Sequence, residues 1–208
     1  MSRGLFIALE GPEGAGKSVQ TSRLAAFLRA RGLAVIQTRE PGGTEIGDEI
    51  RTVLLRQRDS GMLPQTEALL LAASRAQHVR TVIQPALDRG DVVICDRYVD
   101  STYAYQGGGR QLGRAALQPI QAFATGGQEP DLRLLLDLPV DIGLSRRFAD
   151  PASLNRIDQD DLAFHERVRA AYLALVADHP EAWVVIDATR SIEEVGRQIR
   201  DAVIPHLA

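Results

Sequence analysis

Lysine is almost absent from this chain of 208 residues, because 23 of its 24 basic residues are arginine and only Lys17 is lysine. A codon bias toward arginine is the simplest explanation of that imbalance, so it excludes no class of protein. Cysteine is equally scarce, since Cys95 is the only one in the chain. An internal disulfide is therefore impossible, and we expect a reducing, cytoplasmic location.

Long apolar runs and an excess of positive charge are also missing. No run approaches the ~18 apolar residues of a membrane span, and we expect no signal peptide. The formal net charge is −3, whereas nucleic-acid-binding proteins usually carry a basic excess. We therefore expect neither a membrane nor a nucleic acid as partner. A hydrophobic content of 45% is ordinary for a globular protein, and the length suits one domain over residues 1–208.

Five short apolar runs predict buried strands, and longer helical patterns separate them. The runs cover residues 4–9, 33–38, 91–96, 132–138 and 183–187. Strands this apolar, alternating with helices, are typical of a parallel sheet covered on both faces, so we predict a doubly wound α/β fold with five parallel strands. Ligands of such sheets bind at the carboxyl ends of the strands. That rule selects residues 10–18, 39–43, 96–97 and 187–190.

The segment after the first predicted strand matches the phosphate-binding pattern G-x-x-x-x-G-K-[ST]. Its glycines let successive N–H groups point at phosphate oxygens, at the positive end of the following helix. Lys17 supplies a compact positive charge to the phosphates, and the Ser18 hydroxyl can ligate Mg²⁺. We predict a nucleoside triphosphate site made of Gly11, Pro12, Glu13, Gly14, Ala15, Gly16, Lys17 and Ser18.

A phosphate-binding loop does not by itself name the reaction. A GTPase with an N-K-x-D motif is excluded, because the only lysine lies in the loop. Regulatory and motor ATPases stay possible, whereas a small-molecule kinase needs an acceptor site. Asp96 and Arg97 end the third predicted strand, and Asp96 can serve as a general base or in the Mg²⁺ shell. Arg97 favours an anionic acceptor such as a phosphate monoester, which needs no general base.

Several motifs then occur together in one order, and with them the chain resembles the bacterial thymidylate kinases along nearly its whole length. The resemblance implies a P-loop nucleoside monophosphate kinase that transfers the γ-phosphoryl group of ATP to dTMP, giving dTDP, with Mg²⁺. It also implies a homodimer. The matching stretches are LEGPEGAGKS at 9–18, TREPGGT at 38–44, SRAQ at 74–77, Asp96-Arg97, STYAYQGGGR at 101–110 and Asp187-Ala188-Thr189.

The resemblance also implies roles for single side chains, most of them in an acceptor region over about 39–75 and 96–110. Glu10 is similar to an acid that contacts the sugar 3′-hydroxyl, and Arg51 and Arg97 resemble a pair that grips the acceptor phosphate. Arg75 is similar to an arginine that donates to a pyrimidine carbonyl. Tyr105 matches a ring that lies against the deoxyribose and disfavours a 2′-hydroxyl.

Three more implied roles concern the base and the loop over it. Ser101 and Gln106 match residues near the base. Leu71 departs from the family, because many relatives have an aromatic ring there that stacks on thymine. Leu71 lies four residues before Arg75, hence on the same helix face, so either base affinity is weaker or another ring substitutes. Arg39 positions the phosphate or the loop itself. We also expect the glycines at 107–109 to make their segment mobile.

A polar stretch at about 145–158 lies where the family carries a lid over ATP. The P-loop has no arginine, and the bacterial type neutralises the transferring phosphoryl group with lid arginines instead. Arg146, Arg147 and Arg156 are the candidates, and Arg156 is the best match. The predicted catalytic set is Lys17, Asp96, Arg97 and Arg156, with Ser18 and Asp96 as metal ligands.

Two alternatives to a dTMP kinase remain at this point. One is a kinase for another pyrimidine monophosphate, dUMP or CMP. The other is a nucleotide-binding regulatory protein that keeps the P-loop without turnover. The pairing of Asp96 with Arg97, together with a second phosphate-gripping arginine, favours a kinase.

Overall fold

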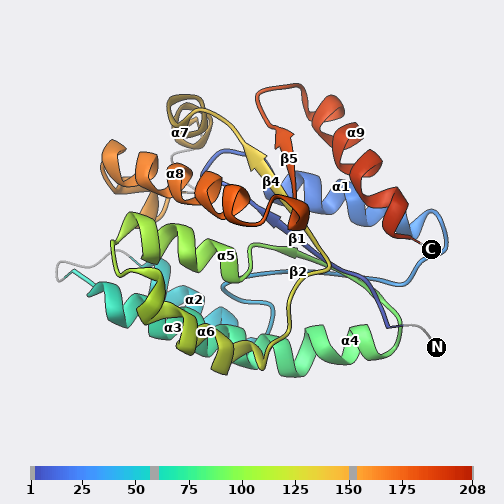
Figure 1. Ribbon diagram of the computed structural model, residues 1–208, viewed down its shortest axis with the longest axis horizontal. Helices are drawn as coiled ribbons and strands as arrows, with labels where there is room; N and C mark the ends of the chain where they lie inside the picture. Colours follow the sequence, from blue (N-terminus) through green and yellow to red (C-terminus); the bar gives the residue numbers. More distant parts are fainter. Residues whose placement is uncertain (1–2, 57–60, 150–153, 208) are drawn as a thin grey trace.

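The computed structural model describes residues 3–56, 61–149 and 154–207. Its strands form one parallel sheet in the order β2-β3-β1-β4-β5 (Figure 1). Each predicted strand overlaps an observed one, and the ends differ by at most two residues. The predicted fold class is therefore confirmed. The strands are β1 (Phe6–Glu10), β2 (Val35–Arg39), β3 (Val92–Asp96), β4 (Leu132–Asp137) and β5 (Trp183–Asp187).

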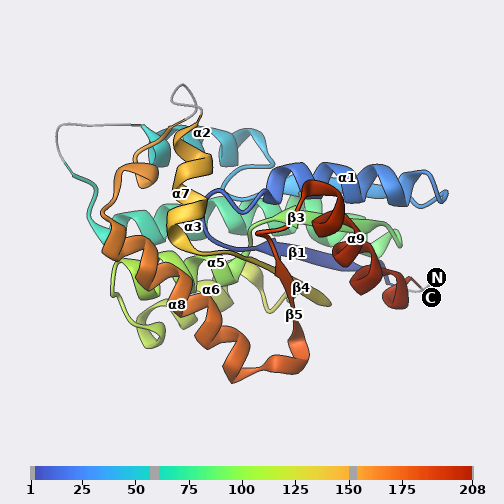
Figure 2. The same ribbon diagram turned by 90° about the horizontal axis from the view of Figure 1, so that it is seen from above.

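Alternate side chains of the central strand β1 enter two different cores, as the two-residue period of a strand requires. Ile7 and Leu9 pack under α1 (Lys17–Arg29) and α9 (Ile192–Val203), while Phe6 and Ala8 pack on the opposite face. Figure 2 looks onto the face of the sheet that α1 and α9 cover. The remaining helices are α2 (Glu45–Leu55), α3 (Pro64–His78), α4 (Gln84–Asp88), α5 (Val99–Thr102), α6 (Arg114–Thr125), α7 (Val140–Phe148) and α8 (Leu162–Asp178).

The helical stretch that begins at Pro64 is interrupted shortly before Pro85. A π-helical turn over Val79–Ile83 separates α3 from α4, and Pro85 lies in the first turn of α4. Proline lacks an N–H and its ring crowds the carbonyl four residues earlier, which is Thr81 inside the turn. Helix α1 stops at Arg29, and Gly32 lies beyond it with a φ of +81° in the turn to β2.

Gly108 and Gly109 serve close packing, while the mobility expected for the segment 107–109 stays a prediction. They belong to a π-helical segment, Tyr103–Gly109, that continues α5 and lies against α8. A Cβ on Gly109 would lie 2.5 Å from Cε2 of Phe164, and one on Gly108 would lie 2.5 Å from Cβ of Ala171. Only glycine allows this approach of two helices, because any larger side chain overlaps α8.

Within the described ranges, every helix is too short or too polar to cross a membrane.

Candidate active site

A cavity of about 650 Å³ opens at the carboxyl ends of the strands. The P-loop, the loop after β2, the end of β3, α3 and the segment after α7 contribute to its walls. Five predicted site residues are absent from its lining, namely Glu10, Gly11, Pro12, Ala15 and Arg156. The predicted residues that line it are Glu13, Gly14, Gly16, Lys17, Ser18, Arg39, Arg51, Leu71, Arg75, Asp96, Arg97, Ser101, Tyr105, Gln106, Arg146 and Arg147.

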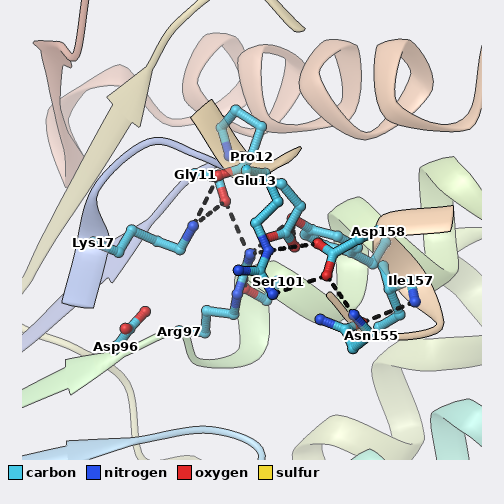
Figure 3. A network of polar contacts seen from close by, with 12 residues as sticks. Gly11, Pro12, Glu13, Lys17, Asp96, Arg97, Ser101, Asn155, Ile157 and Asp158 are labelled. Atoms are coloured by element: carbon cyan, nitrogen blue, oxygen red, sulfur yellow. Dashed lines mark hydrogen bonds and ion pairs between the residues drawn. The ribbon is translucent and has the colours of Figure 1, made fainter. Parts of the chain in front are cut away.

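The P-loop encloses its own lysine. Gly16 adopts the left-handed conformation just before α1, which only glycine does without strain. Lys17 Nζ donates to the carbonyls of Gly11 at 3.0 Å and Pro12 at 2.8 Å (Figure 3). Burial, followed by the positive charge of Arg97, lowers the pKa of Lys17 to about 8. An ammonium in this position gains much from an arriving phosphate, because the phosphate restores its lost solvation.

Ser18 and Asp96 lie side by side at the start of α1 and the end of β3. The Ser18 hydroxyl donates to Oδ2 of Asp96 at 2.5 Å. Both groups offer hard oxygen ligands next to the phosphate loop, and magnesium takes carboxylate and phosphate oxygens in this setting. The donor set therefore fits the predicted Mg²⁺.

Arg97 occupies the centre of the cavity in a strained conformation. Its φ of +73° lies in the left-handed region, which is uncommon for residues other than glycine. The Cys95 thiol donates to the Arg97 carbonyl, and the Arg97 N–H donates to Leu9. The guanidinium donates to Glu13 at 2.8 Å and to the Tyr105 hydroxyl at 2.9 Å. Arg97, which the sequence predicts to bind the acceptor phosphate, is thus held rigidly.

Glu13 is the carboxylate with which the P-loop lines the cavity. Burial alone favours its neutral acid, but Arg97, then Lys17 and the Tyr105 hydroxyl outweigh burial and lower the pKa of Glu13 to about 2. Its side chain is 19% exposed. Glu13 is therefore ionised at neutral pH and can accept a hydrogen bond from a ligand hydroxyl.

Glu10 does not have the position predicted for it. It is 0% exposed, below the cavity, and accepts hydrogen bonds from the Tyr98 N–H at 2.7 Å and the Ser101 hydroxyl at 2.6 Å. The Tyr172 hydroxyl donates to it at 2.9 Å. Burial, followed by the charge of Asp100, raises the pKa of Glu10 to about 7. Glu10 is therefore enclosed by three protein donors and does not line the cavity, whereas Glu13 does.

A second group of cations faces Arg97 across the cavity. Arg51 Nη1 donates to the Pro41 carbonyl at 3.0 Å, and Arg39 lies 3.4 Å from Asp48. Burial, then the charge of Arg39, lowers the pKa of Arg51. A guanidinium whose pKa is lowered by neighbouring arginines marks a site for an anion, whose charge would relieve the repulsion.

The opposite end of the cavity is lined by one face of α3 and by the segment after α5. Leu71 and Arg75 lie there, as their spacing predicted. Gln106 Nε2 donates to Glu67 at 2.6 Å, which fixes the amide orientation because a carboxylate only accepts. Its Oε1 is buried and has no partner among the described residues. An unpaired buried acceptor is costly, so this atom points to a donor on a bound ligand.

The lid arginines are not equivalent. Arg146 donates to the carbonyls of Ala188 at 2.8 Å and Thr189 at 3.3 Å, in the turn after β5. Arg147 binds both carboxylate oxygens of the buried Asp158 at 2.9 Å. Its charge also contributes to the low pKa of Glu13.

Arg156, in contrast, contacts Glu67 and the Leu54 carbonyl at the acceptor end. Arg156, which matches the family's lid arginine best, therefore lies away from the P-loop in this structure. Residues 150–153 of the predicted lid lie outside the described residues.

Comparison with known proteins identifies this arrangement. The family model described as thymidylate kinase matches residues 9–199. The chain belongs to the thymidylate kinase family. It is 51% identical over 202 residues to a thymidylate kinase of Pseudomonas putida, covering 97% of this chain and 95% of the relative.

It is also 53% identical over 190 residues to a thymidylate kinase of Thermomicrobium roseum, covering 91% and 90% of the two chains. The predicted family and its activity class, ATP-dependent phosphotransfer to thymidylate, are thereby confirmed.

Tyr172 and His78 help to shape the site of this kinase and carry no sequence signal of their own. Tyr172 is one aromatic residue in the helical pattern of α8, yet its hydroxyl contacts Glu10 and lies 2.8 Å from Ser101. His78 is buried on α3 and contacts Glu40, the first residue after β2. The one available clue was that His78 lies three residues after Arg75, which places both on one face of α3.

Proposed function

We propose that the enzyme phosphorylates dTMP in this cavity, with the thymine between Arg75 and Gln106. The observation that carries the proposal is the pair of hydrogen-bonding groups at that end. Gln106 offers the unpaired acceptor described above. Arg75 donates four of its five N–H groups to described partners, which leaves one donor.

The acceptor of Gln106 and the donor of Arg75 together complement the hydrogen-bonding edge of thymine. Thymine presents an N3–H donor next to its O4 acceptor, whereas cytosine presents an acceptor next to an amino donor. Cytosine would therefore leave both protein groups unpaired, and an unpaired buried group costs about 1–3 kcal/mol. Leu71 supplies an apolar wall for the ring.

The acceptor phosphate is placed between Arg51 and Arg97. A phosphate monoester with a second pKa of about 6 is mostly dianionic at neutral pH, so one of its oxygens attacks the γ-phosphorus without a general base. Catalysis then consists of alignment and charge neutralisation. Asp96 is then not needed as a base, and together with Ser18 it would hold Mg²⁺. Bound Mg²⁺ would neutralise charge on the triphosphate.

The sugar lies over Glu13 and Tyr105 in this arrangement. Glu13 accepts from the 3′-hydroxyl, and the Tyr105 ring is fixed by edge contacts to Phe164 and Tyr172, with centroids 6.2 and 6.3 Å away. Because the Tyr105 ring is held on both sides, it cannot move aside to make room for a 2′-hydroxyl. Deoxynucleotides are favoured for this reason.

Gln106→Leu tests the placement of the base. The variant removes the unpaired acceptor and keeps a similar volume. We expect kcat/KM for dTMP to fall at least about 10-fold relative to kcat/KM for dCMP, which is the effect of one good hydrogen bond. An unchanged dTMP:dCMP ratio contradicts the placement.

On the ATP side we propose Lys17, Arg146 and Arg147 as phosphate ligands. Arg147, beside the P-loop, replaces Arg156 as the candidate that stabilises the transferring phosphoryl group. Arginines in that role contribute 10³–10⁵ in other phosphotransferases, so Arg147→Ala should lower kcat by at least ~10²-fold. Arg156→Ala should chiefly raise KM for dTMP. The reverse pattern would restore Arg156 to the transition state.

We further propose a homodimer formed by α2, α3 and α6, and a cytoplasmic location. The three helices adjoin one another at the lower edge of Figure 1. Each carries an exposed apolar side chain, including Phe123 at 90% and Leu69 at 56% exposure. The location rests on Cys95, which is a free buried thiol.

A further inference from the structure

Arg75 is a buried cation whose orientation depends on Glu40. Arg75 is 1% exposed and Glu40 is 3% exposed. Arg75 Nε donates to Oε2 of Glu40 at 2.6 Å, while its Nη groups donate to Thr102 at 3.0 Å and to the Tyr98 carbonyl at 2.9 Å. A buried charge is tolerated only with its counter-ion in place, so Glu40, together with these partners, fixes where Arg75 points.

Glu40 is in turn held by His78. His78 is 0% exposed on α3, and its Nδ1 lies 2.9 Å from Oε1 of Glu40. Its Nε2 lies 2.6 Å from the Thr38 hydroxyl at the end of β2. Because the carboxylate only accepts, Nδ1 carries a proton and donates to Glu40, while Nε2 is hydrogen-bonded to Thr38. One hydrogen-bonded series therefore runs from Thr38 through His78 and Glu40 to Arg75.

This cluster is not a metal site, although Glu40, His78 and Cys95 bring their ligand atoms within 4.8 Å of one another. Arg75 occupies one oxygen of Glu40, and both ring nitrogens of His78 are hydrogen-bonded. The Cys95 thiol donates to the Arg97 carbonyl, and burial raises its pKa. A cation would have to displace Arg75 and deprotonate a neutral thiol.

We infer that His78 is a positioning residue that fixes Arg75 through Glu40 and thereby sets the preference for thymine over cytosine. The inference rests on the proposed placement of the base. Without the Nδ1–H donor, Oε1 of Glu40 is unpaired and the carboxylate is free to rotate toward other donors. The remaining N–H of Arg75 then loses its fixed direction toward the base carbonyl, and the penalty against the cytosine amino group falls with it.

Two amide variants of His78 separate this role from packing. His78→Asn places its amide near Nδ1 and keeps a donor for Glu40. His78→Gln places its amide near Nε2 and keeps the Thr38 contact alone. Both remove the ring, so loss of packing affects them alike. The measurements are kcat/KM for dTMP and dCMP, KM for ATP, and the melting temperature.

We expect His78→Gln to lower the dTMP:dCMP ratio of kcat/KM about 10-fold, the effect of one hydrogen bond, with KM for ATP within about twofold of the parent value. His78→Asn should retain the ratio to within about threefold. An equal fall in both variants, or a fall in neither, overturns the inference. If either variant does not fold, Glu40→Gln replaces the pair, and an unchanged ratio in it is equally decisive against the inference.

Arg75→Met distinguishes a failure of the inference from a failure of the proposed function. If Arg75→Met leaves the dTMP:dCMP ratio unchanged, Arg75 does not contact the base and the proposed placement is wrong. If Arg75→Met lowers the ratio while His78→Gln does not, the placement stands and only the role of His78 is refuted.

Discussion

The single lysine makes the P-loop accessible to a direct titration. Lys17 is buried, donates to two loop carbonyls and faces the charge of Arg97, and its pKa is lowered from 10.5 to about 8. At pH 7.5 about a quarter of such side chains are neutral, against about one in a thousand for an ordinary lysine. Because only the neutral amine is acylated, the pH dependence of labelling reports this pKa.

The expected rise in the rate of acylation with pH follows from the pKa values of Lys17 and of an ordinary lysine. Between pH 6.5 and 9 the neutral fraction of an amine with a pKa of 8 rises about 30-fold and levels off. The same interval raises the neutral fraction of an ordinary lysine about 300-fold, and that fraction is still climbing at pH 9. Restricted access to the buried Nζ scales every rate by one factor, so it cancels from the ratio.

The assay is pulse acylation followed by peptide mass mapping, which separates Lys17 from the α-amino group. A model lysine amide in the same tube gives the reference curve. We expect a midpoint near pH 8 for Lys17, and strong protection by ATP, whose phosphates cover the amine and raise its pKa. A midpoint near 10.5 would refute the electrostatic account, and labelling unaffected by ATP would remove Lys17 from the phosphate site.

Three further predictions concern stability and assembly. The pKa of Glu10 is about 7 in the folded protein, against 4.5 ordinarily. The unfolded chain therefore loses this proton at lower pH, so the folded protein becomes less stable as the pH rises between those values. Relative to the Glu10→Gln variant, the free energy of unfolding should fall by about 2 kcal/mol between pH 5 and 7.5, measured by urea unfolding. Parallel pH profiles of the two proteins contradict this prediction. Gly109→Ala should cost about 1–3 kcal/mol through overlap with α8, whereas at Gly107 an added Cβ comes no closer than 3.4 Å to its neighbours. Equal unfolding midpoints for Gly109→Ala and Gly107→Ala argue against the packing role. Phe123→Arg should halve the mass measured by light scattering, and a parent protein that is itself monomeric rules out the dimer.

The sequence predicts the parts of this enzyme that depend on local pattern. Apolar runs identify the strands, because buried parallel strands have no polar face to break the run. The P-loop follows from residue identities at fixed spacing, and Asp96-Arg97 follows from the rule that strand ends carry the site. The kink at Pro85 follows from its missing donor.

The sequence does not predict the features of the site that depend on where side chains point after folding. Glu10 and Glu13 are both acids near one strand end, and only the packing of α8, with Tyr172, shows that Glu10 is buried and Glu13 faces the cavity. Arg156 matches a motif, yet its partner Glu67 lies 89 positions away in the chain. The pairing of His78 with Glu40 likewise joins two segments that no periodicity connects.

We propose above all that this enzyme consumes ATP only when a thymine deoxynucleotide fills the acceptor half of the cavity. The most direct measurement is ADP release with no acceptor and with dTMP, dUMP, UMP, dCMP and CMP in turn. We predict negligible release without an acceptor and the highest kcat/KM for dTMP. Rapid hydrolysis without an acceptor, or the highest kcat/KM on a ribonucleotide, would contradict the account.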